Sequence, residues 1–395
     1  MDLAVIKTIR FSNTITNSGQ AWKTHCNWGF RVLLFSFSTT GLSPSRPISS
    51  SSSREEGTVD MSRQMNDVET ATAEEEQVMS EVHLGCPPGL SGPHISHFTI
   101  SLPSCKSADA SKNEDETASM NQTIGVDEDG DLVLIRRNKP FSHCHRLTIR
   151  HNITSSIPSV GLQVWKAELV LCDFVLHKMS TSSEYDRIVA LELGAGTGLV
   201  GILLARVAET VFLTDHGDEI LENCAKNVDL NSGLFNGRAA VQVRELDWMS
   251  PWPPRVSPSK SPLNKRYTWT LSEVEEVQEA SLLVAADVIY SDDLTDAFFS
   301  VLERLMSLGS EKVLYLALEK RYNFSLSDLD VVANGYSHFC SYLKDEKECE
   351  DFEKRSVPCF VGKRIKIAQI PQYVKEYDRG NDVELWQIKY ERRRS

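Results

Sequence analysis

Leu191-Glu-Leu-Gly-Ala-Gly-Thr-Gly-Leu199 is the stretch of the chain that decides its fold. It follows an apolar run and precedes a helical pattern, so it lies where a buried strand ends and a helix begins. Gly194, Gly196 and Gly198 allow a sharp turn and let a ligand approach the backbone without meeting a Cβ atom. The helix that follows directs unpaired N–H groups into the same space. In an open α/β sheet this is the crevice beyond the carboxyl end of a strand, where ligands bind.

Apolar runs and amphipathic stretches alternate on both sides of this loop. Such an alternation predicts βαβ units and a parallel sheet covered by helices on both faces, which is an α/β, Rossmann-like fold. The five expected strands are Ile188–Leu193, Val211–Thr214, Ala240–Val243, Ser281–Ala286 and Lys312–Leu318. The expected helices are Val164–His177, Leu199–Val207, Glu219–Leu230 and Leu294–Met306.

The last part of the chain shows a different pattern. Arg364–Ile370 and Val383–Tyr390 are two expected strands joined by a polar loop that is too short for a crossover helix. We therefore expect them to form an antiparallel hairpin. Five parallel strands followed by such a hairpin make a mostly parallel sheet of seven strands.

Three interpretations of the glycine loop are open. Residues 196–201 (Gly-Thr-Gly-Leu-Val-Gly) match the GxGxxG pattern of dinucleotide-binding proteins, but Gly194 already occupies the place of the first glycine. Glu192, on the strand before the loop, suits a cofactor with an ammonium group better than one with phosphates. These features favour S-adenosylmethionine over a nucleotide. A glycine-rich turn that binds no ligand is the third interpretation.

The exits of the next two strands supply candidate contacts for a cofactor. Asp215 ends the second strand, about 20 residues after the first glycines, where a carboxylate can accept both ribose hydroxyls. It could instead cap the helix that follows Gly217. Asp247 and Trp248 follow the third strand. The carboxylate can bond the amine of an adenine and the indole offers a flat apolar wall, although Trp248 could also be a core residue.

The fourth strand ends in Ala285-Ala-Asp287-Val-Ile-Tyr290, and its exit lies beside the glycine loop in such a sheet. Methyl transfer to an amine needs a neutral nucleophile held in line at about 3–3.5 Å. Asp287 and Tyr290 could hold that amine by hydrogen bonds, or they could cap and pack the next helix. The Pro-Pro element that is typical of enzymes methylating nucleic-acid bases is absent here, which disfavours a base as the acceptor.

Residues 1–126 differ in composition from the rest of the chain. Residues 1–54 contain six Lys or Arg and one acid, Asp2, whereas acidic runs such as Glu74-Glu-Glu76 follow. A stretch rich in Ser, Pro and acids buries too little surface to offset its ordering entropy. We therefore expect residues 1–126 to be disordered and one domain to occupy residues 127–395, with a first short strand at Leu132-Val-Leu-Ile135.

Charge and cysteine content exclude several kinds of protein. A net charge of −13 disfavours binding to nucleic acid. The nine cysteines form no CxxC pair, which is typical of reduced thiols in an intracellular protein, and we expect no metal site. No apolar run is long enough to span a bilayer, so we expect no membrane partner. The basic start is compatible with a mitochondrial transit peptide or with an unstructured N-terminus.

Four motifs, in this order, resemble the family-16 methyltransferases. They are Gly161-Leu-Gln-Val-Trp165-Lys-Ala, Leu191–Gly198, Leu246-Asp-Trp248 and Asp287-Val-Ile-Tyr290. Members of this family are seven-strand class I enzymes, largely protein lysine methyltransferases, whose hallmark is an Asp/Glu-x-x-Tyr/Phe element. The resemblance covers about residues 127–395.

This resemblance implies a role for each motif. Trp165, the Gly194 loop, Asp215, Trp248 and Ala286 would contact S-adenosylmethionine, and Asp287 and Tyr290 would face the acceptor. The implied activity is methylation of a lysine in a protein substrate, in the nucleus or the cytosol, and we expect a monomer. Two alternatives are a cofactor-binding interaction module with little turnover and a methyltransferase that acts on a small molecule.

Overall fold

The computed structural model of the 395-residue chain divides into two units. The larger unit is Val78–Arg321 with Ala333–Ser395, and the smaller one is Met1–Gln77 with Tyr322–Val332. The structure describes residues 77–83, 92–101, 125–126, 132–133, 144–256, 266–325, 329–345 and 358–391. The smaller unit contains a short antiparallel ribbon of β12 (Asn323–Ser325) and β13 (Asp330–Val332).

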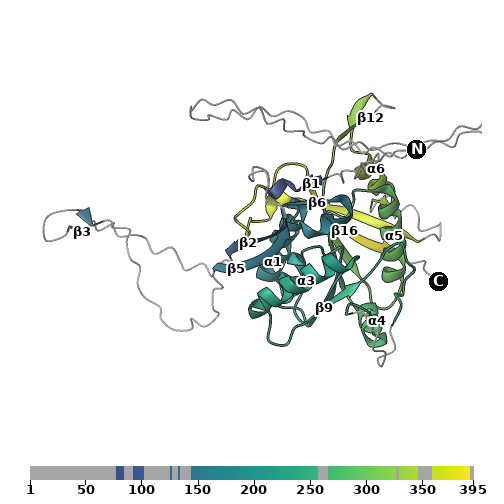
Figure 1. Cartoon of the computed structure of the whole chain (residues 1–395), viewed down its shortest axis with the longest axis horizontal. Helices are drawn as coiled ribbons and strands as arrows, with labels where there is room; N and C mark the ends of the chain where they lie inside the picture. The colour runs from purple at the N-terminus through teal and green to yellow at the C-terminus, as the bar shows by residue number, and fades with distance from the viewer. Residues whose placement is uncertain are drawn as a thin grey trace, which may run out of the picture. The chain divides into compact units, whose positions relative to one another are not determined.

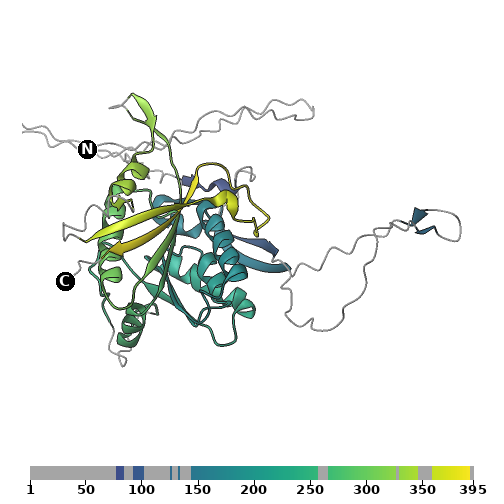
Figure 2. The ribbon, with the colours of Figure 1, turned by 180° about the vertical axis from the view of Figure 1, so that it is seen from behind.

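A mixed sheet of eight strands forms the centre of the larger unit (Figures 1 and 2). Five of its strands are parallel and adjacent, in the order β11-β10-β7-β8-β9. Each overlaps one of the apolar runs predicted to be a strand, which confirms the parallel part of the fold. Their bounds are β7 (Val189–Leu193), β8 (Thr210–Asp215), β9 (Ala240–Glu245), β10 (Leu282–Ala286) and β11 (Val313–Glu319).

An antiparallel pair extends the sheet beyond β11. β16 (Val383–Glu391) lies between β11 and β15 (Cys359–Ile365) and is antiparallel to both. The predicted hairpin is therefore confirmed, although its first strand begins and ends earlier than expected because residues 366–370 turn into a short 3-10 helix, η5 (Ile367–Gln369). The two-residue β14 (Leu343–Lys344) runs parallel to β15 at the edge.

Helices cover both faces of the sheet because neighbouring strand residues point to opposite sides. Val211 and Leu213 pack with one set of helices, whereas Phe212 packs with the other. The first set comprises α1 (Lys166–Thr181), α2 (Leu199–Leu204) and α3 (Asp218–Asn231). The second set comprises α4 (Leu271–Gln278), α5 (Asp292–Ser307) and α6 (Asn334–Ser341). The predicted arrangement, a sheet covered by helices on both faces, is thus confirmed.

Described segments before residue 127 belong to this fold, which corrects the expected boundary. β2 (Pro93–Ser101) pairs along its whole length with β5 (Cys144–Asn152), and its Phe98 and Ile100 are buried. Their alternation with polar residues gives the strand one apolar face, although the composition around it is polar. The prediction that residues 1–126 lie outside the fold is therefore wrong for these segments, and most of that region lies outside the described residues.

Several short elements lie outside the eight-stranded sheet. β1 (Gln77–Met79) pairs with β6 (Thr154–Ser156), and β3 (Gly125–Val126) pairs with β4 (Leu132–Val133). The 3-10 helices η1 (Glu81–His83), η2 (Ile157–Leu162) and η3 (Ser232–Leu234) lie in connections. Within the described part of the chain, no helix is both long enough and apolar enough to cross a membrane.

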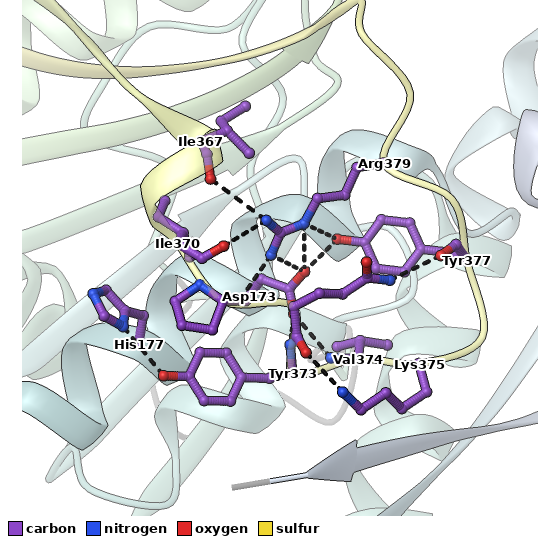
Figure 3. Close-up of polar contacts among 11 residues, drawn as sticks. Asp173, His177, Ile367, Ile370, Tyr373, Val374, Lys375, Tyr377 and Arg379 are labelled. Atoms are coloured by element: carbon purple, nitrogen blue, oxygen red, sulfur yellow. Dashed lines mark hydrogen bonds and ion pairs between the residues drawn. The ribbon is translucent and has the colours of Figure 1, made fainter. Parts of the chain in front are cut away.

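A buried polar network joins α1 to the connection between β15 and β16 (Figure 3). Asp173 of α1 is fully buried and accepts hydrogen bonds from the backbone N–H groups of Tyr373 (2.7 Å) and Val374 (2.8 Å). It also pairs with the guanidinium of Arg379 at 2.7 Å and accepts a bond from the Tyr377 hydroxyl. The connection is therefore fixed to the helix that begins beside the site described next.

Candidate active site

The glycine loop between β7 and α2 forms a cradle that has no room for side chains. The φ angles of Gly194, Gly196 and Gly198 are 68°, 51° and 80°, a region that residues with a Cβ atom rarely adopt. A Cβ atom on Gly194 would come within 2.7 Å of the Val288 side chain and 3.2 Å of the Trp248 ring. The loop therefore presents bare backbone to the space at the carboxyl end of the sheet.

Two buried carboxylates hold this loop and the start of α2 through hydrogen bonds. Glu168 of α1 accepts hydrogen bonds from the Thr197 hydroxyl (2.7 Å) and the Leu199 N–H (3.3 Å), and burial raises its pKa to about 7. Glu192 accepts a bond from the Gly201 N–H at 2.8 Å, and burial raises the pKa of its carboxyl well above the usual range. Glu192 is thus bonded to α2 inside the fold, and its expected contact with a ligand ammonium stays a prediction.

Asp215 lies beside the glycine loop at the end of β8. One of its oxygens accepts a hydrogen bond from the Gly196 N–H at 2.7 Å, and the other accepts one from the His216 N–H at 2.7 Å. Burial raises the pKa of this carboxyl. The N-cap of α3 is Gly217, without a side-chain cap, so the capping interpretation of Asp215 is wrong. The structure therefore brings the expected ribose contact to the loop.

The residues after β9 lie at the same edge of the sheet. The Trp248 ring packs edge-on against Phe298, with 5.1 Å between ring centres, and its other end borders the glycine loop. The Asp247 carboxylate accepts hydrogen bonds from the Met249 N–H and the Ser250 hydroxyl, both at 2.9 Å. Asp247 therefore orders the turn after β9, and its bond to an adenine stays a prediction.

The exit of β10 contains the expected reaction residues. Asp287 has a φ angle of 55° and is buried, and Tyr290 is 41% exposed. One Asp287 oxygen accepts a bond from the Glu319 N–H at 3.3 Å, and the other pairs with the Arg321 guanidinium. Burial raises the pKa of Asp287 against the opposing charge of Arg321. The N-cap of α5 is Ser291, so Asp287 does not cap that helix.

A network of charges surrounds Asp287, and sequence reasoning missed most of it. Arg321 also pairs with Glu81 at 3.0 Å, and Lys166 of α1 pairs with Glu319 at 2.5 Å. Glu319 and Arg321 stand at the exit of the fifth predicted strand, next to the exit that contains Asp287, so strand order alone could have indicated them. No pattern in the sequence indicated that Glu81 belongs to this network, because it lies in a polar region far away in the sequence.

Trp165, at the start of α1, lies against this network. It is the N-cap residue of α1, and its indole N–H donates to the Val160 carbonyl at 3.0 Å. The Arg321 guanidinium lies 4.9 Å from the centre of the Trp165 ring, within the range of a cation–π contact. Ala286 is the last residue of β10, directly before Asp287. Trp165 thus contacts Arg321 of this network, and Ala286 adjoins Asp287 along the chain.

A buried glutamine holds Glu81 in this place. The Gln163 side chain accepts a hydrogen bond from the Ser80 N–H at 2.7 Å and donates to the Val78 carbonyl at 3.0 Å. The Ser80 hydroxyl donates to the Val164 carbonyl at 2.6 Å. Ser80 and Gln163 are both buried. The segment 78–81 is therefore fixed to the loop before α1.

A cavity of about 510 Å³ opens farther along the same region, by the end of β9 and the start of α3. Four of the six residues that line it are acidic, and the six are Asp218, Glu219, Glu222, Glu245, Arg266 and Tyr267. Glu222 accepts hydrogen bonds from Arg266 (2.6 Å) and the Tyr267 hydroxyl (2.8 Å). These two partners already satisfy one oxygen of Glu222.

Comparison with known proteins agrees with this geometry. Residues 142–334 match a family described as lysine methyltransferase. Methyltransferase-like protein 22 of Mus musculus is 31% identical over 338 residues, which cover 76% of this chain and 80% of that protein. The human protein of the same name is 37% identical over 245 residues, which cover 61% of this chain and 57% of that protein. Protein-lysine N-methyltransferase EFM6 of Saccharomyces cerevisiae is 24% identical over 209 residues, which cover 47% of this chain and 77% of that protein.

Proposed function

The chain belongs to the lysine methyltransferase family, and on this premise we propose that it transfers a methyl group from S-adenosylmethionine to a lysine side chain of a protein substrate. The observation that carries the proposal is the position of the Asp287 network. It follows β10, which is the strand adjacent to β7 and its glycine loop. A methyl donor bound at the loop and an amine bound at the network would therefore be neighbours.

The residues at the loop fit S-adenosylmethionine. Gly194 and Gly196 keep the tight path of the loop, because a Cβ atom on either would meet neighbouring protein atoms. Asp215 can accept the ribose hydroxyls, because its carboxylate already lies against the loop. Asp247 and Trp248 would hold the adenine, with Gly198, Trp165 and Ala286 as further contacts. When bound, this cofactor supplies a methyl group that a neutral amine can attack.

The residues at the network fit a lysine as acceptor. A lysine ammonium is attracted to a site with several carboxylates, and the long apolar stem lets it reach a recessed group. Tyr290 is partly exposed, and burial followed by the charges of Asp215 and Asp287 raises its pKa to about 12. Its phenol therefore stays neutral near pH 7 and can orient the amine. Asp287 holds Arg321 and the exit of β11 in place around the bound amine.

Transfer of labelled methyl groups tests this function. Purified protein would be incubated with tritiated S-adenosylmethionine and with nuclear or cytosolic extracts of cells that lack it, and labelled proteins would be analysed by mass spectrometry. We expect the label on lysine side chains of one or a few proteins. Label that appears only in small molecules would support a small-molecule methyltransferase. Donor binding without any label would support an interaction module.

A further inference from the structure

Two carboxylates at the acceptor network each have one oxygen without a partner. Among the residues that the structure describes, Glu81 Oε2 and Glu319 Oε2 are buried and accept no hydrogen bond. The other oxygen of each is occupied, by Arg321 at 3.0 Å and by Lys166 at 2.5 Å. The Glu319 side chain is only 10% exposed. A buried carboxylate oxygen without a donor is costly, so these two atoms indicate a donor that the fold itself does not supply.

These oxygens lie where the acceptor is expected to bind, and not where the cofactor is expected to bind. Glu319 ends β11, the neighbour of β10 on the side away from β7. Both oxygens of Asp287 are already bonded, one to the Glu319 N–H and one to Arg321. Among the three carboxylates, the oxygens to which the described residues supply no donor therefore belong to Glu319 and Glu81.

The charges of the network indicate what kind of donor is missing. It contains three carboxylates, Glu81, Asp287 and Glu319, and two cations, Lys166 and Arg321. With every group ionised, three negative and two positive charges leave one negative charge. A lysine ammonium adds one positive charge and three N–H donors, which would balance the network and bond both open oxygens.

We propose that Glu319 and Glu81 bind the ammonium of the substrate lysine and that Glu319 removes one of its protons. The inference rests on the function proposed above and assigns its acceptor site. In the proton transfer, an N–H bond breaks, its electron pair stays on nitrogen, and an O–H bond forms on Glu319. One positive and one negative charge disappear together, and the amine becomes the neutral nucleophile that methyl transfer requires. Asp287 is then a positioning residue that acts through Arg321 and β11.

The protonation equilibria of the two glutamates are consistent with different roles. Burial, and then the charge of Glu81, raise the pKa of Glu319 to about 7, with a smaller rise from Asp287 and an opposing effect of Lys166. Burial also acts to raise the pKa of Glu81, but Arg321 and Lys166 outweigh it and lower that pKa. Glu81 thus keeps its charge near pH 7 and attracts the ammonium. Glu319 has a pKa suited to a general base at that pH.

Binding of a lysine probe tests the site without turnover. The probe is Nα-acetyl-L-lysine methylamide, and Nα-acetyl-L-norleucine methylamide is the matched compound without the ammonium. Saturation-transfer NMR would compare wild type, Glu319→Gln, Glu81→Gln and the control Glu311→Gln. Glu311 precedes β11 at its opposite end, and its side chain is 86% exposed. We expect wild type and Glu311→Gln to bind the lysine probe, and each site variant to bind it about tenfold more weakly or worse.

The pH dependence of methyl transfer tests the proton step. With extract proteins as acceptors, kcat/KM of wild type should level off above about pH 7, where Glu319 is ionised. Glu319→Gln should be at least about tenfold slower at pH 7 and should keep rising with pH, because it depends on amine that is already neutral. Its affinity for S-adenosylmethionine, measured by calorimetry, should stay within about twofold of wild type.

The outcomes separate this inference from the proposed function. Wild-type probe affinity and a wild-type pH profile in Glu319→Gln would overturn the inference while the methyltransferase activity stands. Absence of methyl transfer by wild type would instead overturn the proposed function, and the lysine probe would still test whether the two carboxylates bind an ammonium. If Glu319→Gln does not fold, Glu81→Gln decides the binding question, because Glu81 lies in the short 3-10 helix η1, outside the central sheet.

Discussion

Asp287 has a left-handed backbone conformation, which side chains rarely adopt and which is concentrated at functional sites. Asn tolerates this conformation well, so Asp287→Asn should keep the fold and remove only the negative charge. Arg321 would then lack its buried partner and would repel an incoming ammonium. We expect affinity for S-adenosylmethionine within about twofold of wild type by calorimetry, together with loss of most methyl transfer in the tritium assay. Full activity, or equal losses of affinity and turnover, would contradict this.

Asp215→Ala should weaken S-adenosylmethionine binding about ten- to a hundredfold, because a carboxylate bonded to two hydroxyls contributes about 1.5–3 kcal/mol. The same carboxylate bonds Gly196 in the free protein, so part of the loss could come from a disordered loop. Calorimetry should therefore be paired with thermal unfolding of the free protein. The control is Asp229→Ala on the exposed side of α3, which should change neither quantity. Unchanged affinity in Asp215→Ala would remove this residue from the cofactor site.

Glu168 should make the protein less stable as pH rises. Burial raises its pKa from an ordinary value of 4.5 to about 7, so between these values the folded state binds the proton that the unfolded chain releases. The contribution of the protonated carboxyl is thus full below about pH 4.5 and is lost as pH approaches 7. Glu168→Gln keeps the acceptor oxygen for Thr197 and cannot ionise. Urea unfolding at pH 5 and pH 8 should show that the variant gains stability relative to wild type at the higher pH.

From the sequence, the positions of the candidate cofactor residues could be predicted better than those of the proposed acceptor residues. Asp215 and Trp248 follow parallel strands directly, and parallel strands bring their exits to one edge. The direction of Glu192 could not be predicted, because both faces of a central parallel strand are buried. Glu319 and Glu81 were missed for a different reason. Their common site depends on a bond between Ser80 and Gln163, which no pattern along the chain reveals.

The early strand β2 should be needed for stability. A chain that begins at residue 92 keeps β2, whereas one that begins at residue 102 loses the buried side chains of Phe98 and Ile100. Burial of each such side chain contributes about 1.5–3 kcal/mol. We expect the shorter chain to be less stable by roughly 3–6 kcal/mol in urea unfolding. Equal midpoints for the two chains would show that β2 is only an accessory strand.

Elements with long apolar runs were predictable, and those with mixed composition were not. The five parallel strands are buried on both faces and read as continuous apolar runs. β2 has only two fully buried apolar residues within a polar region, so its composition concealed it. α4 was also missed, although Thr270 and Glu273 form a capping box that marks its start. That signal follows a stretch with five prolines between residues 251 and 262, which is typical of a loop.

At the scale of the whole molecule, the Asp173 network joins parts of the chain about 200 residues apart (Figure 3). Val374 of the same connection also bridges to Ile100 of β2, so three separate segments meet there. Asp173→Asn would leave the largely buried Arg379 without a counter-charge, and breaking such a pair costs about 3–5 kcal/mol. Urea unfolding should show this loss. The control Asp186→Asn, at an exposed position after α1, should unfold like wild type.

The place of β16 between β11 and β15 has a consequence for biosynthesis. A chain leaves the ribosome with its N-terminus first, so β11 and β15 are both made before the strand that joins them. Until β16 follows, the N–H and C=O groups along one edge of β11 lack the only strand that pairs with that edge among the described residues. Open edges of this kind pair readily with other chains. Newly made molecules should therefore depend more on chaperones during this interval than the finished enzyme does.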